Sequence, residues 1–243
     1  MFARRWHPIR AHGGTLSAYE APRHQYPDPG DRMDGAERSG GGLDIADRES
    51  LVPVTGTSGV HDILWHCSLL ASSEHASLIE LDTEPRLRGI AVLPHGSEPC
   101  HIDYDVLCDQ DWMPRSCRVS VALPEHVSTI ELTRGDVGRW EYNGTAAPRL
   151  MGCSDIDLGW TPATNTIPVR RLDLEIGDTA SIRAAWVRFP ELDVVPNQQH
   201  YTRLASDRWR YRSGEYDFEL VTDAPTGMVL QYGDDLWTAV GRN

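Results

Sequence analysis

Residues 101–106 read HIDYDV, and this alternation of polar and apolar side chains decides the fold. Successive side chains of a β-strand point to opposite faces, so Ile102, Tyr104 and Val106 share one face and the three polar residues share the other. The pattern predicts a half-buried strand with the apolar set inward and the polar set in solvent.

The same period of two recurs from His61 onward, with turn residues about every ten positions. Further segments with this pattern are residues 79–82, 119–123, 129–132, 182–189, 209–211, 216–220 and 228–232. The dipeptide Asn143-Gly144 predicts a hairpin turn. Residues 194–206, VVPNQQHYTRLAS, fit one helical turn or a loop, and periodicity does not choose between them.

The fold class that follows is all-β. About a dozen antiparallel strands without crossover helices must form a sandwich or curl into a barrel, since one flat sheet would expose a whole apolar face. Residues 59–243 are predicted to form this domain. Residues 1–58 are rich in Gly, Pro, Asp and Arg and lack a hydrophobic period, so we predict a disordered leader there.

The charge balance excludes several partners. The chain has 243 residues and carries 23 basic residues, all arginine, against 36 acids, for a net charge of -13. Nucleic acids and anionic membrane surfaces attract basic stripes, so neither is expected as a partner. No window approaches 18 consecutive apolar residues, and no membrane span is predicted.

The cysteines indicate a reducing compartment. Their number is odd, five, and none forms a Cys-x-x-Cys pair. We therefore predict reduced thiols and a cytoplasmic location. Arg4-Arg5 is followed by His7 and Pro8 rather than by an apolar run, which argues against export.

No metal or other cofactor is predicted. The polar residues of the 101–106 strand lie on one face roughly 6.5 to 7 Å apart, too far to share one ion without help from elsewhere.

The string DIDLGWTPATNTIPVRRLDL, residues 155–174, is the most distinctive in the chain. Its Thr-Pro and Thr-Asn-Thr groups form turns, and Pro168 is interpreted as the start of an extended segment in which Arg170 and Arg171 point to opposite faces. Two roles stay open for the inward arginine. It either pairs with Asp155 or Asp157 and braces the turn, or it holds an anionic or sugar head group at a cavity mouth.

Catalysis is the less favoured reading. Neither a Gly-x-Ser-x-Gly elbow nor a glycine-rich phosphate loop occurs. Carboxylates are so plentiful that no acid pair stands out as glycosidase-like.

The chain resembles the putative glycolipid-binding family of bacterial proteins from about residue 61 to the end. The resemblance rests on the string at 155–174, followed in order by residues 187–190 with Leu192, then 199–201, Tyr211, Asp223, 227–229 and 231–232. It implies an antiparallel spiral β-roll, or open barrel, around an apolar cavity, and a lipid or glycolipid as ligand.

The function expected from these observations is non-catalytic binding of a lipid, glycolipid or similar amphiphile in that cavity. The runner-up is an enzyme acting on such a molecule in the same cavity, and the third reading is a scaffold with a filled barrel. The expected ligand-binding residues are Ile102, Tyr104, Val106, Trp186, Tyr211, Arg171, Arg170 and Asn165, with Arg171 preferred as the head-group contact.

Overall fold

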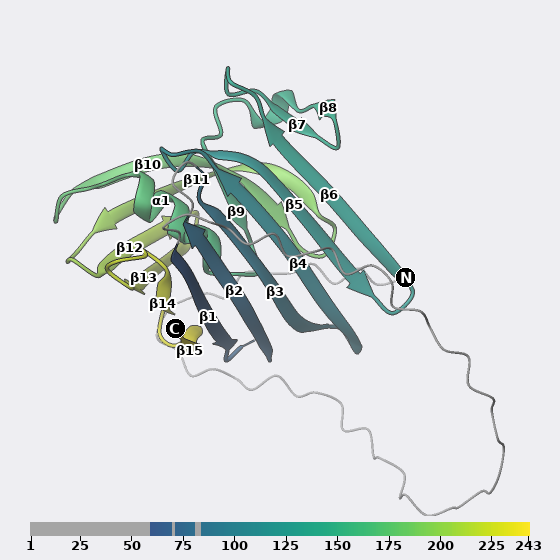
Figure 1. Cartoon of the computed structure of the whole chain (residues 1–243), viewed down its shortest axis with the longest axis horizontal. Coiled ribbons are helices and arrows are strands. Elements are labelled where there is room, and N and C mark those ends of the chain that lie inside the picture. Colours follow the sequence, from purple (N-terminus) through teal and green to yellow (C-terminus); the bar gives the residue numbers. More distant parts are fainter. Residues whose placement is uncertain (1–58, 70, 81–83) are drawn as a thin grey trace, which may run out of the picture. The chain divides into compact units, whose positions relative to one another are not determined.

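A computed structural model describes residues 59–69, 71–80 and 84–243, so the predicted leader at 1–58 lies outside the described residues. The strands of the described residues form one 15-stranded sheet in the order β8-β7-β6-β5-β4-β3-β2-β1-β15-β14-β13-β12-β11-β10-β9 (Figure 1). Neighbouring strands are antiparallel except β9 and β10, which are parallel. The all-β prediction is confirmed.

The first eight strands are β1 (Gly59–Cys67), β2 (Ser72–Glu80), β3 (Arg86–His95), β4 (Glu98–Cys108), β5 (Pro114–Leu123), β6 (His126–Arg134), β7 (Trp140–Tyr142) and β8 (Thr145–Ala146). Then follow η1 (Pro148–Leu150), β9 (Asp155–Leu158), η2 (Ala163–Asn165) and α1 (Thr166–Arg171). The remaining strands are β10 (Thr179–Arg188), β11 (Asp193–Arg203), β12 (Arg208–Ser213), β13 (Tyr216–Thr222), β14 (Val229–Tyr232) and β15 (Trp237–Arg242). No helix in the described part of the chain is long and apolar enough to cross a membrane.

Several local predictions are confirmed. In β4, Ile102, Tyr104 and Val106 are buried while His101 is exposed. Asn143 and Gly144 both have positive φ, 49° and 71°, as the tight turn between β7 and β8 requires.

Two predictions are wrong. Residues 194–206 are neither a helical turn nor a loop, because most of them belong to β11. Pro168 does not begin an extended segment, because residues 166–171 form α1. A proline is tolerated there because the amide groups of a first helical turn have no intrahelical acceptor to lose.

One face of the sheet is continuous from end to end. Paired residues carry it from Tyr104 in β4 through Gly89 in β3 and Ala76 in β2 to Ile63 in β1. On the far side it continues through Tyr211 paired with Tyr201. We call this the inner face.

The two ends of the sheet overlap. Strands β9 to β11 pass behind β4 and β5 in Figure 1, and they carry buried residues on both faces. On their outer face, the larger core includes Ile156, Leu158, Ala185, Val187 and Val194, together with inner-face residues of β4 to β7. Hydrogen bonds from Trp140 Nε1 to the Cys153 carbonyl (2.9 Å) and from Tyr142 Oη to the Leu192 carbonyl (3.4 Å) join the layers. The sheet is therefore an open roll.

Residues 159–171, here called the interior segment, follow β9, include η2 and α1, and lie against the inner face. Every residue from 160 to 169 is buried. Ile167 packs in the larger core, while Val169 belongs to a second core with Tyr201, Trp209 and Tyr211. The segment thus contacts both halves of the rolled sheet.

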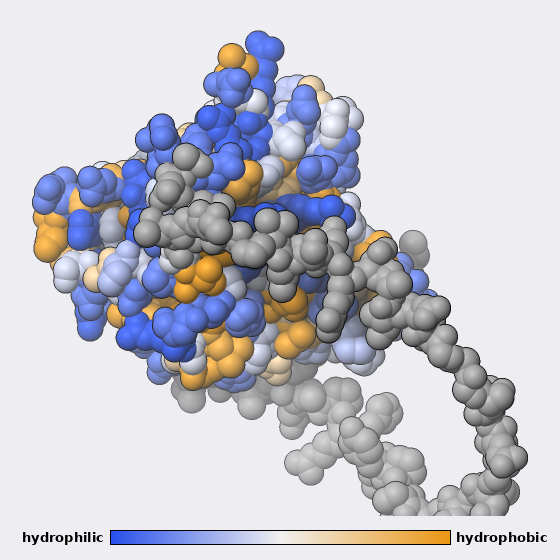
Figure 2. Space-filling model, in the orientation of Figure 1, coloured by the Kyte–Doolittle hydropathy of each residue, from blue (hydrophilic) through white to orange (hydrophobic). Residues whose placement is uncertain are grey.

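The outer face of β1 to β4 combines apolar and charged residues. Arg86 and Arg88 both pair with Asp105, as expected for a solvated face. Large apolar side chains are also exposed there, with Val60 at 52%, Ile90 at 50% and Val92 at 52% of their surface. Figure 2 shows such apolar side chains in orange among charged ones in blue.

Replacing Gly89 by alanine tests the packing of the inner face. A Cβ atom at position 89 would lie 2.3 Å from Tyr104 Oη, so Tyr104 must shift. We expect the free energy of unfolding to fall by roughly 1 to 3 kcal/mol, the usual cost of overpacking.

Gly241→Ala is the matched control, because the nearest atom to its new Cβ is Leu64 Cβ at 3.7 Å. Urea unfolding measures both variants. Equal stability of the two would contradict the packing of Tyr104 across Gly89.

Candidate functional site

The predicted wall residues divide between two places on the inner face. Ile102, Tyr104 and Val106 lie in the larger core with 0%, 3% and 0% of their surface exposed. Tyr211 lies in the second core, and Trp186 is half-buried on the inner face of β10 opposite Asp157 of β9. The structure therefore does not bring all five together.

The predicted head-group residues belong to the interior segment. Arg171 pairs with the buried Asp155, with Nη2 2.5 Å from Oδ2, which is the bracing contact foreseen for this arginine. Arg170 pairs with Glu80 at 2.8 Å and lies over the ring of Trp112. The two arginines occupy successive helical positions, so the expectation of opposite strand faces is wrong.

Asn165 belongs to a polar cluster that the sequence patterns did not predict. Tyr201 Oη donates to Asn165 Oδ1 at 2.8 Å, and Gln199 Nε2 donates to Asp157 Oδ2 at 2.6 Å. Asn197 Nδ2 donates to Ser213 Oγ at 2.8 Å. Strands β9, β11 and β12 thus bring a carboxylate, amides and hydroxyls onto one stretch of the inner face.

Burial in this polar cluster disfavours the charged form of its acid, Asp157. Burial raises the pKa of Asp157 to about 6, against the opposing hydrogen bonds from Gln199 and Asn197. Burial also raises the pKa values of Tyr201, Tyr211 and Tyr232 well above their usual range, so these phenols stay protonated and donate hydrogen bonds.

Aromatic rings border the same polar cluster. Tyr211 contacts Tyr201 and Tyr232 with ring centroids 5.3 and 6.1 Å apart. Phe218 contacts Tyr232 at 5.0 Å and stacks on Tyr216 at 6.0 Å. Tyr216, Phe218 and Tyr232 are only partly buried, so they present ring surface beside polar groups. Such a combination suits an amphipathic ligand.

A second buried acid lies at the other wall of the roll. Glu74 of β2 is fully buried, and its Oε1 accepts hydrogen bonds from Tyr104 Oη (2.5 Å) and Thr161 Oγ1 (2.7 Å). Burial raises the pKa of Glu74 to about 7. Thr161 belongs to the Thr-Pro motif, so this acid ties the interior segment to the sheet.

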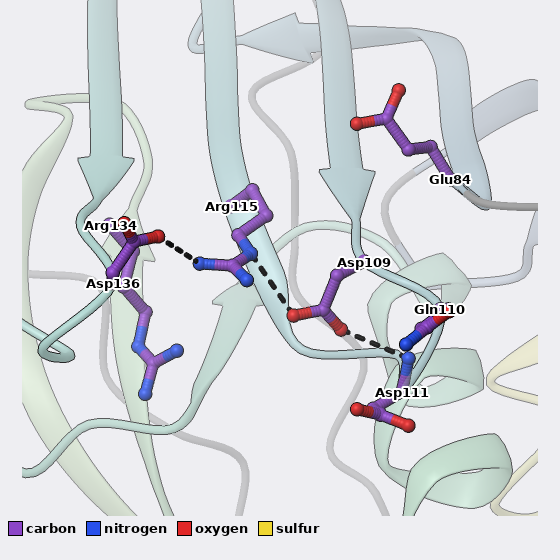
Figure 3. A pocket seen from close by; sticks show the side chains of 7 residues that line it. All are labelled: Glu84, Asp109, Gln110, Asp111, Arg115, Arg134 and Asp136. Atoms are coloured by element: carbon purple, nitrogen blue, oxygen red, sulfur yellow. Dashed lines mark hydrogen bonds and ion pairs between the residues drawn. The ribbon is translucent and has the colours of Figure 1, made fainter.

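A surface hollow of about 510 Å³ lies at the strand ends and is lined by Glu84, Asp109, Gln110, Asp111, Arg115, Arg134 and Asp136. Figure 3 shows Arg115 reaching between two acids, 3.0 Å from Asp109 and 3.2 Å from Asp136. Its lining is polar throughout, unlike the apolar cavity that the sequence predicts. This polar hollow is therefore not the predicted cavity for an acyl chain.

Comparison with known proteins places this fold and its motifs in context. Residues 62–238 match a family described as putative glycolipid-binding. A crystal structure of a DUF1089 family protein from Pseudomonas aeruginosa is 31% identical with a TM-score of 0.60, and the match covers 67% of this chain and 89% of that chain. None of the curated proteins matches.

The bracing role of Arg171 is testable by Arg171→Ala. The change leaves Asp155, with 1% of its side chain exposed, without its ion-pair partner. We expect the free energy of unfolding to fall by roughly 3 to 5 kcal/mol, the usual cost of breaking a buried pair.

Arg208→Ala is the control, because its pair with Glu219 has 54% and 47% of the side chains exposed. Its loss should cost about 1 kcal/mol or less. The bracing role is refuted if urea unfolding finds the two variants equally stable.

Proposed function

Since the chain belongs to the putative glycolipid-binding family, we propose that it is a non-catalytic binding protein for a lipid, glycolipid or similar amphiphile. The observation that carries the proposal is the polar cluster around Asp157, which lies beside the apolar and aromatic residues of the second core. In this proposal the head group of the ligand contacts the polar cluster. The apolar chain of the ligand lies along the aromatic and aliphatic residues beside the cluster.

The chemistry of the cluster favours a neutral, hydroxyl-bearing head group. A carboxylate and amide oxygens accept hydrogen bonds from hydroxyls, while amide and phenol groups donate to them. No arginine of the described residues contributes to the pKa of Asp157, so an anionic head group would meet an acid without a compensating cation there. The arginines of the interior segment, Arg170 and Arg171, then position the segment instead of binding the head group.

Two walls supply the apolar part of the proposed site. Tyr211 and Trp186 stand beside the polar cluster. The inner-face set of β4, with Ile102, Tyr104 and Val106, lies across the interior segment and is reached when that segment moves. A cytoplasmic location belongs to the same proposal, because an odd set of five buried cysteines suits a reducing compartment.

An enzyme acting on the same amphiphile is the second candidate. The observation in its favour is the pair of acids with raised pKa values, Asp157 at about 6 and Glu74 at about 7, since general acids are tuned in this way. Release of sugar from a bound alkyl glucoside on prolonged incubation, abolished in Asp157→Asn, would favour this candidate over simple binding.

A series of alkyl glucosides of increasing chain length tests the binding function. Burial of each methylene contributes about 0.8 kcal/mol, so affinity should rise about three- to fourfold per carbon until the apolar surface is filled. Displacement of a fluorescent fatty acid provides the measurement. An affinity independent of chain length would eliminate a carrier of acyl chains.

Asp157→Asn tests the placement of the head group. The change removes the charge but keeps the shape, so alkyl glucosides should lose roughly tenfold in affinity relative to plain alcohols of equal length. Asp217→Asn is the control, because Asp217 is exposed on β13 and pairs with Arg210. Equal losses for glucosides and alcohols would remove Asp157 from the head-group site.

A further inference from the structure

Glu74 is the acid that holds the interior segment to the wall formed by β2 and β4. Its Oε1 accepts from Tyr104 Oη of β4 and from Thr161 Oγ1 of the interior segment, while its Oε2 has no hydrogen-bond partner among the residues that the structure describes. Glycine at position 89 leaves the room through which Tyr104 reaches Glu74. One buried carboxyl group thus joins three separate elements.

Within the described residues, no cation balances a charge on Glu74. Its direct neighbours across the sheet are Trp65 in β1 and Ala91 in β3. On the elements packed around it, the titratable and charged groups that share the inner face are His61 and Cys67 of β1, Glu80 of β2, His95 of β3, Cys100, Tyr104 and Cys108 of β4, and Asp155, Asp157, Arg170 and Arg171 of β9 and the interior segment.

The cations of that set are engaged elsewhere. His61 and Arg170 both pair with Glu80, Arg171 pairs with Asp155, and His95 contacts the ring of Phe189. An ionised Glu74 would therefore be a buried charge without a counter-ion, which is costly in an apolar surrounding. A neutral Glu74 avoids that cost, and burial raises its pKa accordingly.

We propose that Glu74 is a proton-controlled latch: with its proton it holds the interior segment against β2 and β4, and loss of the proton releases the segment. Release places Glu74 in water and separates it from Thr161. It also uncovers Ile102 and the other apolar residues of β4. The consequence for ligand entry rests on the proposed binding function, whereas the release itself does not.

The sign of the effect follows from linkage. The pKa of Glu74 is about 7 with the segment closed and returns toward 4.5 when the carboxyl group reaches solvent. The open state then binds fewer protons, so the opening equilibrium shifts toward release as pH rises through this window. The opening constant should rise about tenfold per pH unit at first, roughly 70-fold between pH 5 and pH 8, and then level off.

Hydrogen exchange of the ligand-free full chain between pH 5 and pH 8.5 measures this opening. After division by the intrinsic rates, amides of residues 159–171 should lose protection roughly 70-fold and reach a plateau above pH 7. Amides of β4 should not follow the same profile. Glu74→Gln keeps the shape without the titration, so its profile should be flat.

Glu80→Gln is the matched control, an acid of the same strand that contacts Arg170 of the interior segment. It should keep the wild-type pH profile. A profile retained in Glu74→Gln, or shared by β4, would overturn the latch. If Glu74→Gln does not fold, the wild-type profile alone decides, since a flat profile for residues 159–171 refutes the proposal.

Association of dodecyl glucoside at pH 5.5 and pH 7.5 separates the latch from the binding function. Faster association at pH 7.5 in the wild type, but not in Glu74→Gln, supports gating of the site. Association independent of pH, despite release of the segment, overturns the gating. Absence of binding at every pH refutes the proposed function. The latch is then decided by the hydrogen-exchange measurement alone.

Discussion

The overlap of the two ends of the sheet is the constraint on which the rest of the structure depends. A sheet of 15 strands with one apolar face cannot bury that face by itself. Rolling it places the inner face of β4 to β7 on the outer face of β9 to β11. This overlap explains why Ile156, Val187 and Val194 are buried, although the inner face of the same strands carries the polar cluster. The opposite face of β9 to β11 is then free to carry polar groups into the interior.

The interior segment solves the problem that such a roll creates. A turn and a short helix in an interior expose backbone and side-chain polar groups that need partners. Thr161 donates a hydrogen bond to Glu74, and Asn165 accepts one from Tyr201. Arg171 pairs with Asp155. These contacts give a physical role to the Thr-Pro-Ala-Thr-Asn-Thr string. They also hold the segment to both walls through hydrogen bonds, two of which end on buried acids.

Sequence patterns predicted the strands whose two faces differ in polarity. β4 and the hairpin at Asn143 are examples, because one face meets the core and the other meets water. β11 was not predicted as a strand because polar and apolar residues do not alternate along it. Its inner face carries Asn197 and Gln199, and its outer face is covered by the overlap. Helix α1 was not predicted because Pro168, which lies in its first turn, also fits the start of an extended segment. The polar cluster at Asp157 was not predicted because the partners of Asp157 come from strands distant in the sequence.

The central claim is that an amphiphile binds the inner face with its head group at Asp157. Photo-cross-linking tests it most directly, with an alkyl glucoside that carries a diazirine on the carbon next to the sugar. The account predicts adducts on inner-face residues of β9 to β13, such as Trp186 and Tyr216. Adducts confined to the hollow around Arg115, or to the outer face around Ile90, would contradict it.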